Sequence, residues 1–312
     1  MTSIGNGLRA ACILVVALWV QGCVTSTADR VNPIPSPQSV TQGIQGTLQR
    51  YAAFPSRLVP ARTVSVWLPE RYAESTDRRY PVLYVHDGQM LWDAQKTWNH
   101  KSWEVDDVVS QLIAQGKINE VIVVGIDNTP QRFEEYMPYD AVSDAGVRGL
   151  PSMPTVAKSS ITSDAYLRFI VTELKPFVDS SYRTLKTPEN TFMLGSSMGG
   201  LISLYAISEY PDVFGGVAAM STHWPAGDGA MIDYLSRQLP APGTHRIYMD
   251  HGTATLDAEY GTYQIRMDEL MRARGYAVNR NWVTKVFPGA AHDETAWNVR
   301  LHQPLKFLLG TK

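Results

Sequence analysis

A serine at the centre of a Gly-x-Ser-x-Gly pattern is the residue whose surroundings most clearly indicate chemistry in this 312-residue sequence. The pattern covers residues 195–199, with Ser197 in the middle. Residues 191–194 before it are typical of a buried strand, and residues 201–207 after it have the apolar spacing of a helix. A strand, a sharp turn and a helix are the context of a nucleophile elbow, in which the glycines give the turn room. We therefore interpret Ser197 as a nucleophile, the alternative being an ordinary glycine-rich turn.

A serine hydroxyl needs a base, and histidine is the usual one because its pKa is near neutrality. Of seven histidines, His292 is the best placed, on a loop of small residues between the last expected strand and the last expected helix. The alternative is a solvated loop histidine. The acid should follow the preceding strand, where Asp250, Asp257 and Glu259 are candidates. Asp250 could instead fix the turn and Glu259 could cap a helix, so we favour Asp257, which would hold one His292 tautomer.

Hydrolysis through a serine also needs two backbone N–H groups that stabilise the developing oxyanion. Met198, directly after the nucleophile, would supply one of them. We assign the second to Gln89, because residues 86–89 (His-Asp-Gly-Gln) follow an expected strand and Gly88 permits an unusual backbone. A plain turn is the alternative for this stretch.

The elements that must position these residues alternate between strands and helices. This alternation predicts an α/β fold with a mostly parallel central sheet and helices on both faces, in a single domain over residues 47–312. The order of serine, acid and histidine along the chain matches the α/β-hydrolase arrangement, so we expect an α/β-hydrolase fold. In such sheets ligands bind beyond the carboxyl ends of the strands. The expected strands are 63–68, 80–86, 121–126, 191–194, 215–220, 246–250 and 281–287, and the expected helices are 103–115, 163–178, 201–207, 259–274 and 295–309.

Substrate-binding candidates come from the loops of this expected sheet. Arg132 opens a long loop, residues 127–160, and could line the cleft, although a structural ion pair with Glu135 is the alternative. Trp224 could form a wall of the substrate pocket or be buried in the core. The aromatic stretch that contains Trp98 could contact an aromatic or sugar-bearing substrate, although core packing is the commoner use of such residues.

Composition excludes several other classes. The formal net charge is −2 and no Lys/Arg cluster stands out, so we expect no nucleic-acid partner. The two cysteines, Cys12 and Cys23, both lie near the N-terminus, and there is no His-Glu-x-x-His motif, so we expect no metal site. We expect no cofactor, and the oligomeric state stays open.

The N-terminal residues are typical of a targeting segment. Residues 1–23 combine Arg9, a short apolar run and a small-residue end, as secretory signal peptides do. The end resembles a bacterial lipobox, which implies lipidation of Cys23 and, with Val24 after it, an outer-membrane anchor facing the periplasm; a plain signal peptide is the alternative. Residues 24–46 are rich in Ser, Thr, Pro and Gln, and we interpret them as a flexible tether.

Four motifs together resemble the putative-esterase family of α/β-hydrolases, which includes siderophore esterases, feruloyl esterases, S-formylglutathione hydrolase and the mycolyltransferases. The resemblance covers about residues 47–310, and it implies ester hydrolysis through an acyl-serine intermediate without a cofactor. It supports Ser197 and His292 as nucleophile and base. The motifs are His86-Asp87-Gly88-Gln89, Arg132-Phe133-Glu134-Glu135-Tyr136, Gly195-Ser196-Ser197-Met198-Gly199-Gly200 and Pro288-Gly289-Ala290-Ala291-His292.

We therefore expect a serine carboxylic-ester hydrolase that acts on a small-molecule, siderophore or sugar-linked ester. An acyltransferase with the same three residues is one alternative, because only the acceptor of the acyl group would differ. A surface lipoprotein that binds a ligand on a hydrolase scaffold without catalysis is another.

Overall fold

The structure, a computed structural model, describes residues 1–2, 33–243 and 245–311. The chain divides into a short unit, Met1–Val31, and a large unit, Asn32–Lys312, to which all the elements below belong. The expected signal peptide, Cys23 included, lies outside the described residues except for its first two positions. Among the helices of the described residues, none has the length and apolar character needed to cross a membrane.

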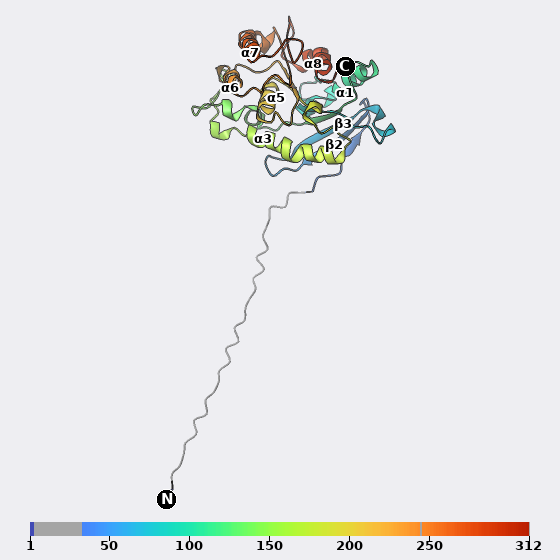
Figure 1. Ribbon diagram of the computed structural model, residues 1–312, viewed down its shortest axis with the longest axis vertical. Helices are drawn as coiled ribbons and strands as arrows, with labels where there is room; N and C mark the ends of the chain where they lie inside the picture. The colour runs from blue at the N-terminus through green and yellow to red at the C-terminus, as the bar shows by residue number, and fades with distance from the viewer. Residues whose placement is uncertain (3–32, 244, 312) are drawn as a thin grey trace. The chain divides into compact units, whose positions relative to one another are not determined.

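A single sheet of nine strands forms the centre of the large unit (Figure 1). Its strands are β1 (Gln38–Val40), β2 (Thr47–Phe54), β3 (Arg62–Leu68), β4 (Val82–His86), β5 (Ile122–Ile126), β6 (Thr191–Ser196), β7 (Gly216–Met220), β8 (Arg246–Gly252) and β9 (Trp282–Phe287). Their order is β1-β2-β3-β5-β4-β6-β7-β8-β9. The first three neighbouring pairs are antiparallel, and every pair from β5 to β9 is parallel. The expectation of an α/β fold with a mostly parallel sheet is confirmed.

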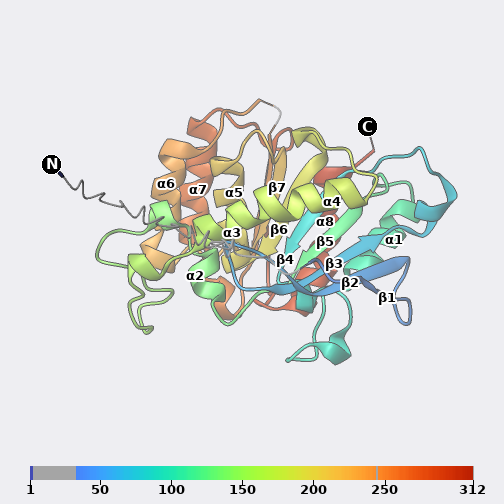
Figure 2. The same ribbon diagram turned by 90° about the horizontal axis from the view of Figure 1, so that it is seen from below.

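Helices cover both faces of this sheet (Figure 2). The α-helices of the described residues are α1 (Val105–Ala114), α2 (Arg132–Tyr136), α3 (Ser163–Phe169), α4 (Lys175–Ser181), α5 (Met198–Glu209), α6 (Ala230–Gln238), α7 (Gly261–Ala273) and α8 (Glu294–Leu309). Short 3-10 helices are η1 (Glu70–Glu74), η2 (Gly88–Met90), η3 (Ala94–Lys96), η4 (Tyr139–Ala141), η5 (Lys158–Ser160), η7 (Pro188–Asn190), η8 (Ala226–Asp228) and η9 (Thr255–Glu259), and a π-helical turn, η6 (Ile170–Leu174), joins α3 to α4.

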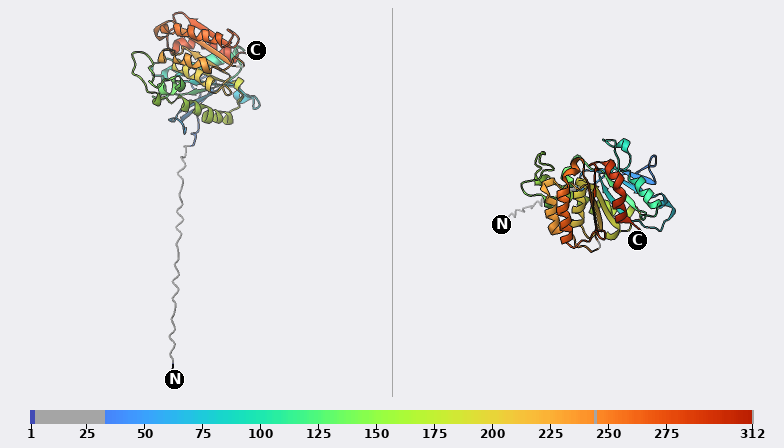
Figure 3. Two further views of the ribbon diagram at one scale, coloured as in Figure 1. Left: turned by 60° about the vertical axis from the view of Figure 1, so that its left-hand side comes forward. Right: turned by 90° about the horizontal axis from the view of Figure 1, so that it is seen from above.

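The buried strands explain why two helical layers form. Along β4, Val82 and Tyr84 join one hydrophobic core with α5, whereas Leu83 and Val85 join the other with α1 and α8. Successive side chains of a strand point to opposite faces, so a continuously apolar strand needs cover on both sides. Helix α8, drawn in dark red, lies against β7 and β8 on the face seen from above (Figure 3).

The elements that were not expected include β1, α2 and α6. Residues 38–40, which the sequence places in the tether, form β1 and pair with β2 through Gln38–Arg50, Ser39–Gln49 and Val40–Leu48. Their polar character gives no strand signal, because the ladder to β2 rather than apolar burial holds them. Helix α2 lies near the start of the expected loop 127–160, and α6 lies in the loop that follows β7. The expected tether is therefore wrong over β1, and the sheet begins before residue 47.

The parallel strands bring the predicted site residues to one edge of the sheet. The residues just past β4, β6, β8 and β9 include Gln89, Ser197, Asp257 and His292, respectively. Since the carboxyl ends of parallel strands share an edge, these four segments of distant sequence meet there.

Candidate active site

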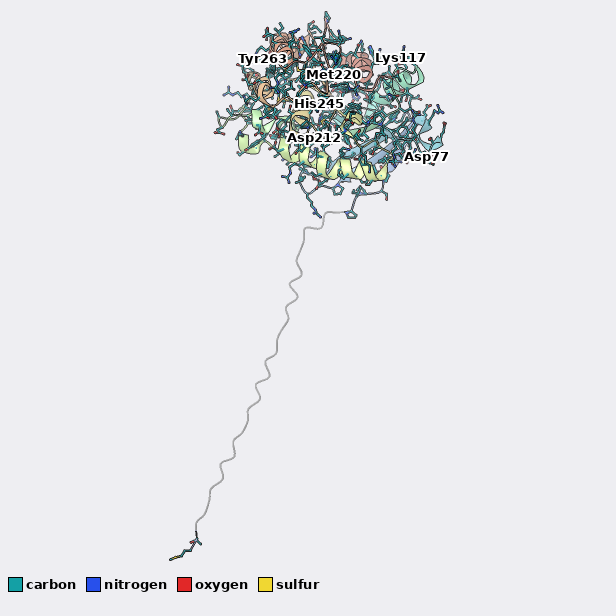
Figure 4. All side chains as sticks on the ribbon, viewed as in Figure 1. Asp77, Lys117, Asp212, Met220, His245 and Tyr263 are labelled. Atoms are coloured by element: carbon teal, nitrogen blue, oxygen red, sulfur yellow. The ribbon has the colours of Figure 1, made fainter. Side chains whose placement is uncertain are left out.

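Ser197 occupies the sharp turn between β6 and α5. Its backbone, at φ 58° and ψ −123°, lies in a region that non-glycine residues rarely adopt. The turn is held by a hydrogen bond of 3.0 Å from the Ser197 N–H to the carbonyl oxygen of Met220, a buried residue that is labelled in Figure 4. A Cβ on Gly195 would lie 2.5 Å from the carbonyl oxygen of Gly199, so glycine is required there. The turn therefore has the geometry of a nucleophile elbow.

His292 and Asp257 form a short hydrogen bond beside this turn. His292 Nδ1 lies 2.5 Å from Asp257 Oδ1, and the His292 N–H donates to Thr255 Oγ1 at 2.8 Å. Asp257 is buried in η9. Burial alone would raise the pKa of Asp257, but hydrogen bonds from His292 and Ser221 outweigh it and hold that pKa below its usual value. The carboxylate is therefore ionised at neutral pH and can hold His292.

The two other candidate acids do not contact His292 through any hydrogen bond of the described residues. Asp250 accepts hydrogen bonds from Tyr248 Oη at 2.8 Å and from Arg300 Nε at 3.2 Å. Glu259 is exposed at the end of η9. Of the three candidates that the sequence left open, Asp257 is the one in the position of a triad acid.

Ser197 and His292 face a common cavity of about 550 Å³. Gln89 lines the same cavity, and no backbone hydrogen bond of the described residues engages its N–H. The N–H of Met198 is the first of α5, and the first N–H groups of a helix have no acceptor within it. The N–H groups of both expected oxyanion donors therefore have no backbone acceptor among the described residues.

A bidentate ion pair supports the turn that carries Gln89. Arg132 Nε and Nη2 lie 2.7 and 2.8 Å from the two carboxylate oxygens of Asp87. Asp87 has a left-handed backbone, φ 57°, and also accepts from Asn128 Nδ2 at 2.6 Å. Burial would raise the pKa of Asp87, but Arg132 lowers it. Arg132 lines the cavity as expected, but the alternative pairing with Glu135 is wrong, because Glu135 binds the buried Arg62.

Trp224 is not a wall of the cavity, which corrects the expectation of a substrate contact. Its side chain is fully buried in a hydrophobic core, and its Nε1 donates to Gln264 Oε1 of α7 at 3.0 Å. Trp224 packs in the same hydrophobic core as residues of α6 and α7. Its orientation depends on how these helices pack, so the residues around it in the sequence do not predict it.

Two aromatic residues near the site, Tyr260 and Trp297, escaped the sequence assignment, whereas Trp98 belongs to the stretch that was expected to contact substrate or pack in the core. Trp98 lines the cavity with 82 % of its surface exposed, so its aromatic stretch is not only core packing. The rings of Tyr260 and Trp297 meet the His292 ring edge-on, with centroid distances of 5.6 and 5.0 Å. Trp297 lies five residues after His292, one helical turn into α8, which is a spacing signal that the sequence offered.

The described residues bring together no cluster of three or more His, Cys, Asp or Glu side chains with the arrangement of a metal site. The polar groups in the cavity instead pair with one another. Lys101 Nζ lies 2.7 Å from Asp293 Oδ2, and Asn99 Nδ2 donates to Glu294 Oε2 at 2.9 Å.

Comparison with known proteins agrees with this fold. The chain is 28% identical over 200 residues to the uncharacterized protein YbbA of Bacillus subtilis, covering 62% of this chain and 68% of that protein. It is 26% identical over 189 residues to an endo-1,4-beta-xylanase/feruloyl esterase of Xylanibacter ruminicola, covering 58% of this chain and 22% of that protein.

Two solved structures share the fold. An IroE-like serine hydrolase from Shewanella oneidensis superposes with a TM-score of 0.62 at 20% identity, over 86% of this chain and 79% of that one. The enterobactin esterase FES from Shigella flexneri superposes with a TM-score of 0.57 at 20% identity, over 89% of this chain and 60% of that one. The family model described as "Putative esterase" matches residues 56–308. The chain therefore belongs to the putative esterase family and is an esterase of the α/β-hydrolase fold.

Proposed function

We propose that the protein hydrolyses carboxylic esters through an acyl-serine intermediate, with Ser197 as nucleophile, His292 as base and Asp257 as acid. The observation that carries the proposal is the meeting of two features in one cavity. A serine with φ 58° lies at the start of a helix, and a histidine bound to a buried carboxylate lies across the cavity from it. Strain of this kind at a buried turn is typical of functional residues.

The reaction follows from these groups. Ser197 Oγ bonds to the ester carbonyl carbon while its proton moves to His292 Nε2, and the carbonyl oxygen becomes an oxyanion bound by the N–H groups of Gln89 and Met198. The ester C–O bond then breaks, and the leaving alcohol takes the proton from His292. A water molecule attacks the acyl-serine, gives its proton to His292, and the acid leaves as Ser197 recovers that proton.

A fluorophosphonate probe tests the proposal, because its phosphorus accepts an activated serine oxygen and releases fluoride. We expect label on Ser197 in the wild-type protein, and a loss of labelling rate of at least 10³-fold in His292→Ala. Mass spectrometry of peptides locates the label. His302→Ala, outside the cavity on α8, is the matched control and should label like the wild type. A folded wild-type protein without label on Ser197 would contradict the proposal.

We further propose that the alcohol part of the substrate is a neutral, hydroxyl-rich ring such as a sugar. Both long cationic side chains that line the cavity, Arg132 and Lys101, are already paired with carboxylates. An anionic substrate would therefore find no unpaired lysine or arginine among the described lining residues. The exposed indole of Trp98 offers an apolar face for the ring. Asn99 and Asn128 each use one amide hydrogen for Glu294 and Asp87, and their second amide hydrogens remain for ring hydroxyls. The feruloyl esterase relative supports this choice, whereas the enterobactin esterase that shares the fold supports the alternative of a siderophore ester.

Replacing the exposed indole tests the sugar proposal. In Trp98→Ala we expect KM for a feruloylated or acetylated sugar to rise about tenfold, because the ring loses its stacking surface. Values of kcat should change little, and p-nitrophenyl acetate, which has no sugar, should be hydrolysed as before. Steady-state kinetics on both esters measure the effect. An equal KM for the sugar ester in both proteins, or faster hydrolysis of a catecholate siderophore ester, would overturn the sugar assignment.

A further inference from the structure

A buried hydroxyl lies behind the carboxylate of Asp257. Ser221, directly after β7, is fully buried, and its Oγ lies 2.5 Å from Asp257 Oδ2. Trp297 Nε1 and Arg300 Nη2, both from α8, approach the same Oγ at 3.0 and 2.6 Å. The backbone of Ser221 is left-handed, with φ 42°, which costs a non-glycine residue about 1 kcal/mol or more. A strained serine with three short contacts needs an explanation beyond packing.

The direction of each hydrogen bond follows from the chemistry of the groups. The indole and guanidinium N–H groups can only donate, so Trp297 and Arg300 occupy the two lone pairs of Ser221 Oγ. The single hydroxyl proton of Ser221 must then point to Asp257. The donors from α8 therefore determine the orientation of this hydroxyl.

The donors and acceptors of the Asp257 carboxylate can be assigned in the same way, and they determine which nitrogen of His292 carries the proton. Asp257 Oδ2 accepts from Ser221 and also from the Gly252 N–H at 2.6 Å, so Oδ1 is left for His292. An ionised carboxylate only accepts, so His292 Nδ1 must carry the proton in this bond. The lone pair of Nε2 is then free to take the proton of Ser197. Trp297 contacts both Ser221 and His292, since its Nε1 donates to Ser221 Oγ and its ring packs against the His292 ring at a centroid distance of 5.0 Å.

One buried cation, Arg300, offsets part of the negative charge behind the site. Arg300 lies 3.2 Å from Asp250 Oδ1 and 3.8 Å from Asp257 Oδ2, and all three side chains are almost fully buried. Two carboxylates and one guanidinium leave one net negative charge, on the side that faces His292. A positive charge that develops on His292 during the reaction is therefore stabilised.

We propose that Ser221, oriented by Trp297 and Arg300, is a positioning residue that fixes the Asp257 carboxylate and, through it, the reactive tautomer of His292. This inference rests on the proposed esterase function, because it concerns how the same base is prepared. Ser221 touches no reacting atom. It acts on His292 through two hydrogen bonds, from Ser221 to Asp257 and from His292 to Asp257.

The variant Ser221→Gly isolates the hydroxyl, because glycine adopts φ 42° without strain. We expect kcat for p-nitrophenyl acetate to fall about tenfold with KM unchanged. The downfield proton signal of His292 Nδ1–H, identified by its loss in Asp257→Asn, should weaken or shift in the variant. A second variant, Trp297→Phe, keeps a ring beside His292 but removes the N–H donor, and it should change kcat and the proton signal in the same direction.

The matched control is Trp282→Phe, since the Nε1 of this buried indole has no hydrogen-bond partner among the described residues. It should leave kcat and the proton signal unchanged. If folded Ser221→Gly has the same kcat as the wild type and its His292 Nδ1–H proton signal does not shift, the inference is overturned. Loss of the fold in both Ser221→Gly and Trp297→Phe would assign the network a structural role and also overturn it. Failure of the proposed function is distinguishable, because the wild-type protein itself would then neither hydrolyse esters nor label.

Discussion

Histidine side chains near the site differ in what their surroundings allow them to do. His86, at the end of β4, is buried with Nδ1 2.8 Å from Tyr166 Oη, and burial lowers its pKa to about 3. His223 is also buried, and its pKa falls to about 4 for the same reason. Its Nε2 faces the carbonyl oxygen of Gly149 at 2.9 Å, so Nε2 carries the proton and Nδ1 accepts from Tyr260. Both histidines are therefore neutral structural groups at pH 7, in contrast to the proposed role of His292.

Burial of His86 predicts a pH-dependent stability. In the unfolded chain His86 binds a proton below its ordinary pKa of about 6.5, whereas in the folded protein it stays neutral until the pH falls to about 3. Stability is therefore lost as pH falls through this window, by about 1.4 kcal/mol per pH unit for this group. We expect the free energy of unfolding of His86→Gln to depend less steeply on pH between 6 and 4, by roughly that amount. Urea unfolding at several pH values measures it.

A histidine on the surface provides the comparison. His100→Asn replaces an exposed residue with φ 55°, a conformation that asparagine tolerates. Burial raises the pKa of Asp106 and Asp127 to about 6, so these two carboxyl groups make the folded protein more stable as the pH falls. Both variants keep these groups, so their contribution is the same in His86→Gln and His100→Asn and cancels when the two slopes are compared. Equal slopes for His86→Gln and His100→Asn would contradict the assignment of a buried, neutral His86.

At the scale of elements, the short helix η2 determines where one proposed oxyanion donor lies. It packs directly on the end of β5, because Gly88 at its start has no side chain. A Cβ there would lie 2.7 Å from the Ile126 N–H nitrogen and from Asp127 Oδ1. The bidentate pair between Asp87 and Arg132 ties the same turn to α2. Two unrelated elements thus hold η2 in place beside Ser197.

This packing predicts that Gly88→Ala moves the turn and displaces the N–H of Gln89. We expect kcat to fall about 10²-fold with a smaller change in KM, because an oxyanion donor acts mainly in the transition state. Gly243→Ala is the matched control, since a Cβ at that position meets nothing within 4 Å. Steady-state kinetics with p-nitrophenyl acetate compare the two. Similar kcat values for both variants would mean that Gln89 is not a donor.

At the scale of the whole molecule, the sequence predicted the sheet and the edge of it at which the three proposed catalytic residues lie, because both depend on chain order. Continuous apolar strands alternate with helices, and the carboxyl ends of such strands must share an edge, which brings Ser197, Asp257 and His292 together. Trp224 was misplaced because the direction of a side chain past a strand end depends on which helix packs there. Ser221 was missed because its partners come from α8, far along the chain, and β1 because a polar edge strand has no periodicity of its own.

The exposure of Trp98 gives the molecule a built-in optical probe. The sequence contains eight tryptophans, and among the described residues the other six, at positions 67, 92, 103, 224, 282 and 297, are buried. Among the tryptophans of the described residues, emission at long wavelength and sensitivity to a dissolved quencher such as iodide should therefore come mostly from Trp98, which lines the cavity. A compound that occupies this cavity shields that indole from collisions with the quencher. Occupancy can thus be followed in the unmodified protein by light alone, before any substrate for turnover is known.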